Sequence, residues 1–130
     1  MTPRTERERG AGTLMMAGLA LFVAGLGVIL VVFGAFTLAH QRAEDAADLA
    51  ALSGAQAALD SGDPNQAAQV ACAAARTTAT AHKATVEACD VVAFAGFVGV
   101  EVEVSFPAPF AIPGAPSALK ASARAGNTTR

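Results

Sequence analysis

One stretch constrains this chain more than any other, because no side chain from Gly10 to Ala39 carries a charge. The stretch is dense in Leu, Val, Phe, Met and Ile, and it exceeds the roughly 20 apolar residues that a helix needs to cross about 30 Å of hydrocarbon. A single segment in lipid must bond all its peptide groups internally, and only a helix does so. The sequence predicts a transmembrane helix over 11–39, centred on Leu14–Phe36.

A cleaved secretory signal is the alternative interpretation of the same stretch. The apolar region of such a signal is usually about 7–15 residues long, and Thr37-Leu38-Ala39 resembles a small-residue cleavage site only loosely. We therefore predict an uncleaved span. The alternative predicts a released, secreted domain that starts near His40.

Charges beside the span predict its orientation. Arg4, Arg7 and Arg9 precede it, and Arg42 follows it. Lys and Arg concentrate on the cytoplasmic side of membrane helices. We predict a single-pass cytoplasmic (inner) membrane protein with a cytoplasmic leader over 1–10 and an extracytoplasmic domain over 40–130.

The two cysteines, Cys72 and Cys89, would then lie in an oxidising compartment, where pairing is favoured. The predicted disulfide closes a loop of about 18 residues and contributes roughly 3 kcal/mol to stability. A zinc site usually needs four ligands, and His40 and His82 are the only histidines in the chain. We predict the disulfide and no metal site.

Small residues recur along the span and let helix backbones approach closely in lipid. Such packing would allow a homo-oligomer. The other interpretation, that Gly and Ala are simply common in membrane helices, stays open. The candidate helix-packing face consists of Gly18, Gly25, Gly27 and Gly34.

Beyond the span, the sequence predicts an α+β domain. Residues 41–59 favour helix, so the first helix continues to about Leu59. Asp63 and Pro64 suit the start of a second short helix, ending near residue 77. Alternating apolar and polar residues then predict a small antiparallel β-sheet with strands over 85–94, 98–106 and 119–125. On one face of that sheet, Lys120 and Arg124 are expected to pair with Glu101 and Glu103.

No catalytic constellation is found in the sequence. The serines lack a G-x-S-x-G setting, neither histidine falls in a catalytic motif, and a solvated strand face explains Glu101 and Glu103. The net charge of −2, from 9 Lys+Arg and 11 Asp+Glu, leaves no positive excess for binding phosphates. We expect no enzyme activity, no cofactor and no nucleic-acid partner.

Two segments resemble a known family. Glu8-Arg9-Gly10-Ala11-Gly12-Thr13 resembles the leader junction of class III (Flp/Tad-type) prepilins, which a membrane aspartyl peptidase cuts after the Gly. The run Gln41–Ala55, QRAEDAADLAALSGA, resembles the post-membrane signature of TadE/TadG-like proteins. The overall layout is similar to that of the short TadE-like proteins of actinobacteria.

This resemblance implies a pilin-like fold and a minor pilin or pseudopilin of a Flp/Tad-type pilus or secretion assembly. It also implies leader cleavage between Gly10 and Ala11. The implied partners are other pilin-like subunits, platform proteins, an assembly ATPase complex and a prepilin peptidase. A permanently anchored envelope protein, whose exterior domain binds a partner or ligand, remains the alternative.

Overall fold

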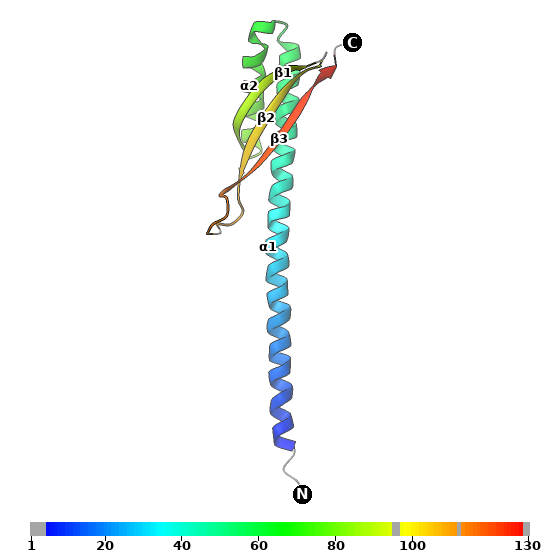
Figure 1. Cartoon of the computed structure of the whole chain (residues 1–130), viewed down its shortest axis with the longest axis vertical. Coiled ribbons are helices and arrows are strands. Elements are labelled where there is room, and N and C mark those ends of the chain that lie inside the picture. Colours follow the sequence, from blue (N-terminus) through cyan, green and yellow to red (C-terminus); the bar gives the residue numbers. More distant parts are fainter. Residues whose placement is uncertain (1–4, 95–96, 112, 129–130) are drawn as a thin grey trace. The chain divides into compact units, whose positions relative to one another are not determined.

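The structure is a computed structural model that describes residues 5–94, 97–111 and 113–128. The chain divides into two compact units, Met1–Ala35 and Phe36–Arg130. The elements are α1 (Thr5–Asp60), α2 (Pro64–Ala81), β1 (Thr85–Phe94), β2 (Phe97–Pro107) and β3 (Ala118–Thr128) (Figure 1). This order of elements confirms the predicted α+β class.

Helix α1 includes the predicted span and its predicted continuation to about Leu59. It ends where Ser61, Gly62 and Asp63 form a short turn. Gly62 has a φ of +63°, a left-handed conformation that glycine adopts without steric cost. Asp63 then caps α2, because its side chain accepts a hydrogen bond from the Asn65 backbone N–H at 2.9 Å.

Helix α2 continues to Ala81, beyond the end predicted near residue 77. The extra turn is held by tertiary contacts. Ala79 is fully buried, and the Thr78 hydroxyl donates a hydrogen bond to the Ser53 hydroxyl of α1 at 2.9 Å. Neither contact is visible in the local helix propensity.

The three strands form one antiparallel sheet in the order β1-β2-β3. Strands β1 and β2 form a hairpin in which Phe94 lies opposite Phe97, and residues 95 and 96 between them lie outside the described residues. The β1–β2 register shifts between Val86 and Ala88. Strand β3 is longer than the predicted 119–125, because its pairing with β2 runs from Ala118 to Thr128.

The core of the unit Phe36–Arg130 lies between one sheet face and the helices. Three consecutive inward positions of β2, Val100, Val102 and Val104, are its largest fully buried side chains. The helices contribute alanines almost exclusively, so their backbones approach the sheet closely. These alanines are Ala46, Ala47, Ala50, Ala51 and Ala55 from α1 and Ala71, Ala75 and Ala79 from α2.

Candidate functional site

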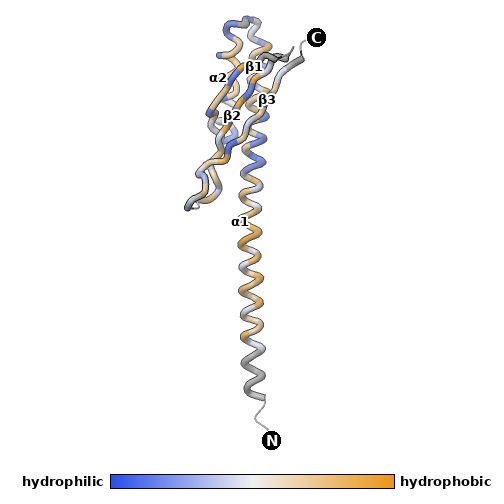
Figure 2. The backbone as a smooth tube through the Cα atoms, in the orientation of Figure 1, coloured by the Kyte–Doolittle hydropathy of each residue, from blue (hydrophilic) through white to orange (hydrophobic). Residues whose placement is uncertain are grey.

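The first candidate site is the apolar surface of α1 within the unit Met1–Ala35. Its large side chains are exposed, Met15 to 80% and Phe33 to 74%. Figure 2 shows hydrophobic residues along this part of α1. The helix is long and apolar enough to cross a membrane, and its most apolar window is not buried within the protein. Lipid or other apolar helices would cover such a surface without leaving peptide groups unbonded.

The four predicted packing glycines lie on this helix. Among the described residues, nothing comes within 4 Å of a Cβ built on Gly18, Gly25, Gly27 or Gly34. Gly18 and Gly25 are about 20° apart around the helix axis, whereas Gly25 and Gly27 are about 160° apart. Helix geometry thus splits the predicted single face into two nearly opposite sides.

The predicted leader junction is only partly described. Gly10 and Ala11 fall within α1, but the surroundings of these two residues are not described. Residues 1–4 lie outside the described residues altogether. The bond that a prepilin peptidase would cut therefore stays a sequence-based prediction.

The second candidate site is the alanine-lined junction between the helices and the sheet. Gly54 marks its closest approach, since an added Cβ would lie 3.1 Å from the Ala71 carbonyl oxygen and 3.3 Å from Val100 Cγ1. The Ser53 hydroxyl donates to the Ala50 carbonyl oxygen at 3.0 Å while accepting from Thr78. The junction thus fixes the position of α2 against the last turns of α1.

A disulfide joins Cys72 of α2 to Cys89 of β1, with Cα atoms 5.9 Å apart. Among the described residues, no group of three or more His, Cys, Asp or Glu side chains could hold a metal ion. His40 instead pairs with Glu44 on the exposed side of α1, at 3.3 Å. The disulfide links the second helix covalently to an edge strand of the sheet.

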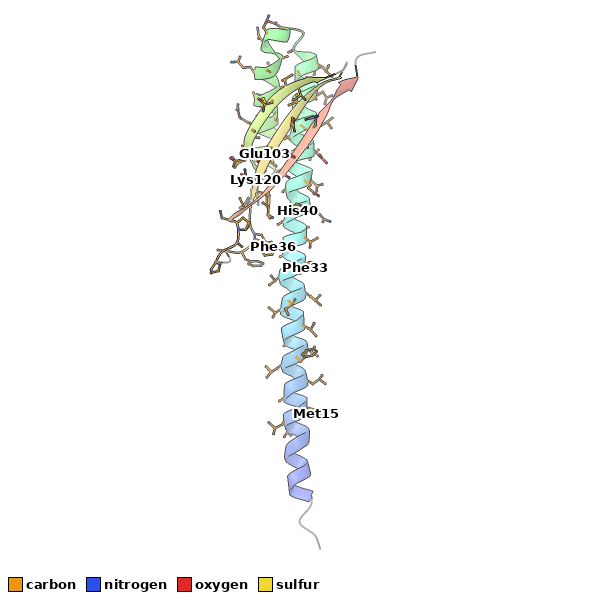
Figure 3. All side chains as sticks on the ribbon, in the orientation of Figure 1. Met15, Phe33, Phe36, His40, Glu103 and Lys120 are labelled. Atoms are coloured by element: carbon orange, nitrogen blue, oxygen red, sulfur yellow. A yellow bond between two sulfur atoms is a disulfide. The ribbon has the colours of Figure 1, made fainter. Side chains whose placement is uncertain are left out.

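The outer face of the sheet is charged, and its cross-strand partners are those expected from the alternation. Arg124 Nη2 lies 2.6 Å from Glu101 Oε2. Lys120 Nζ lies 3.0 Å from Glu103 Oε1, and Figure 3 labels these two residues. The hydrogen bond from Lys120 to Glu103, together with the negative charge of Glu103, raises the pKa of Lys120 above the ordinary value of 10.5. These pairs are solvent-exposed and make a hydrophilic surface.

An open depression of about 610 Å³ lies beside residues 42–49 of α1. Side chains of both charge signs line it, with Arg42 and Lys83 alongside Asp45 and Asp48. Mixed charge at an exposed surface is suited to contact with a polar partner.

Sequence reasoning missed the contact between Phe36 of α1 and Phe110 of the β2–β3 connection. Their ring centroids are 6.3 Å apart and their planes are inclined by 55°. The signal overlooked was the isolated Phe110 within an uncharged run.

These features define a class: a membrane-anchored protein with one N-terminal apolar helix and a small, disulfide-linked α+β unit. Residues 10–57 match the family model described as "Putative Flp pilus-assembly TadE/G-like". The predicted TadE-like family is thereby confirmed over the N-terminal helix, and the match supports involvement in Flp/Tad pilus assembly. No curated protein and no solved structure matches the chain.

Proposed function

We propose that this protein is a minor pilin or pseudopilin-like component of a Flp/Tad-type pilus or secretion assembly. It acts through assembly rather than catalysis. The helix α1 anchors it in the cytoplasmic membrane with the N-terminus inside, and the unit Phe36–Arg130 lies outside the cytoplasm. Its partners are other pilin-like subunits, the platform and ATPase complex, and a prepilin peptidase.

The single observation that carries this proposal is the coincidence of the family match with an unburied apolar helix. The match to residues 10–57 includes the exposed apolar side chains of α1 from Leu14 to Leu38 and ends within the alanine-rich continuation of the helix. A helix of this kind can leave lipid for the core of an assembly, because apolar neighbours replace acyl chains with little loss of burial.

The glycines of α1 add a second argument. The packing of α2 and β2 against Gly54 leaves little room for a side chain at this position. No described residue crowds Gly25 or Gly34 in this way. Two small-residue sides on one helix would accept neighbours on both, as in an extended assembly. A simple dimer would need only one such side.

The N-terminus of the membrane-extracted protein tests the proposal directly. Intact-mass measurement in cells with an active prepilin peptidase should give a mature start at Ala11. Gly10→Leu places a bulky residue at the predicted cleaved bond and should leave Met1 in place, whereas the control Gly12→Ala should still be processed. An uncut wild-type chain that forms no cross-links to pilus machinery would contradict the proposal.

The mixed-charge depression favours one second candidate function. In that alternative the protein is a permanently anchored envelope protein whose exterior unit binds a polar partner or ligand around Arg42, Asp48 and Lys83. It predicts an intact leader and binding that is lost in Asp48→Lys. Processing at Ala11 and cross-links through α1 would instead favour the pseudopilin.

A further inference from the structure

The connection between β2 and β3 is a loop without a charged residue. It runs from Ala108 to Ser117, and three of its residues, Pro109, Pro113 and Pro116, have no backbone N–H to leave unbonded. Its two ends are held together, because the Ala108 N–H donates to the Ser117 carbonyl oxygen at 3.0 Å. Ile112 lies outside the described residues.

Phe110 projects from this loop and is 46% exposed, although it packs against Phe36. Both residues belong to the same compact unit. Figure 3 labels Phe36 on α1 at the level of this loop. The loop thus presents a large apolar side chain outward at one defined height on the helix.

That height is set by where Phe36 falls in the uncharged run of α1. As a helix, the run from Gly10 to Ala39 is about 45 Å long. This length matches the thickness of a bilayer with its headgroup regions, which is about 40–45 Å. Phe36 lies four residues before His40, or about 6 Å along the axis. When α1 spans a bilayer, Phe36 is therefore at the outer interface.

We propose that the β2–β3 loop inserts Phe110 into the interfacial region of the membrane that α1 spans. Two observations favour lipid as the partner of this loop. Phe110 contacts Phe36, which belongs to the uncharged run Gly10–Ala39, and the loop has no charge to desolvate. This inference rests on the membrane anchoring by α1. A second membrane contact restricts rotation of the unit Phe36–Arg130 about the helix.

The chain contains neither Trp nor Tyr, so one introduced Trp reports its own surroundings. Phe110→Trp and, as a second reporter that keeps Phe110, Ala111→Trp are placed in the full-length protein. Phe22→Trp reports the anchor, and Leu59→Trp, at a position 66% exposed near the end of α1, is the distant control. Each variant is reconstituted in phosphatidylcholine and phosphatidylglycerol vesicles with or without brominated acyl chains.

We expect bromine near the headgroup end of the chains to lower the emission of the Phe110→Trp variant about twofold, since interfacial side chains lie about 5–10 Å into the headgroup and acyl boundary. Phe22→Trp should be quenched most by bromine near the methyl end, and Leu59→Trp should not be quenched. Quenching of both loop reporters supports the proposal. If Phe110→Trp does not fold, the thiols of Cys72 and Cys89 become free. The quenching of Ala111→Trp then tests the proposal.

Three outcomes overturn the inference. If the loop reporters escape quenching while Phe22→Trp is quenched, the anchor stands and the loop lies in water. If the loop reporters escape bromine quenching at every protein-to-lipid ratio and are also shielded from water, a second copy covers the loop instead. If Phe22→Trp also escapes quenching, the membrane anchor itself is wrong, and the proposed function falls with it.

Discussion

Gly54 of α1 lies so close to Ala71 of α2 that a Cβ on residue 54 would be 3.1 Å from the Ala71 carbonyl oxygen. A backbone atom within a helix cannot turn aside as a flexible side chain can. The glycine therefore sets the distance between α1, α2 and the Val100 position of the sheet.

Gly54→Leu should consequently destabilise the unit Phe36–Arg130 by about 3 kcal/mol or more through overpacking. Gln56→Leu is the matched control, because residue 56 is exposed two positions further along the same helix. Chemical denaturation of the full chain in detergent measures both. Equal midpoints for the two variants would show that the junction tolerates a larger helix separation.

Reduction of the Cys72–Cys89 disulfide should lower the free energy of unfolding by roughly 3 kcal/mol, because the closed loop restricts the unfolded chain. Thermal unfolding with and without a reductant measures the effect. The Cys72→Ala/Cys89→Ala variant should unfold at the lower temperature and no longer respond to the reductant. A midpoint unchanged by reduction of the wild-type protein would contradict this expectation.

Thr78→Val should cost about 1 kcal/mol, because it removes the hydrogen bond that Thr78 donates to Ser53 between α1 and α2. Thr80→Val makes the same chemical change on exposed α2, where the hydroxyl bonds to the Arg76 carbonyl oxygen of its own helix. Its cost should be smaller. Comparison of the two denaturation curves isolates the interhelical bond from the change in helix propensity.

The pairing of Lys120 with Glu103 should be visible as a raised pKa of Lys120. A group whose pKa is raised by folding contributes its full stabilisation below the unfolded value of 10.5 and loses it as the pH rises through the folded value. The contribution should therefore disappear only in strongly alkaline solution. An NMR titration of the Lys120 side chain tests this, and Glu103→Gln should return the pKa towards its ordinary value.

Bulky residues at the two glycine sides of α1 should weaken assembly without affecting the unit Phe36–Arg130. Gly25→Leu and Gly34→Leu are each expected to lower cross-linking to neighbouring pilin-like subunits about tenfold, the equivalent of ~1.4 kcal/mol. Val28→Leu, which replaces one large exposed side chain by another, should have little effect. Unchanged cross-linking in both glycine variants would show that these glycines do not contact neighbouring subunits. The open glycine positions would then no longer support the proposed pseudopilin function.

Local patterns in the sequence determined much of this fold. The uncharged run predicts α1, Asp63 and Pro64 predict the start of α2, and alternation predicts which side chains of β2 face outward. Alternation also predicts that Glu101 and Arg124 share one face of the sheet, because two-residue periodicity fixes the faces of antiparallel strands. These features depend on near neighbours in the chain or on a single regular repeat.

Only the tertiary structure decided the relationships between distant segments. Nothing local distinguishes Gly54, which the chain's own α2 crowds, from Gly25, which no described residue approaches. The extra turn of α2 and the contact of Phe110 with Phe36 likewise depend on which surfaces meet. Periodicity specifies the face of an element, whereas packing between elements selects which residues on that face come into contact.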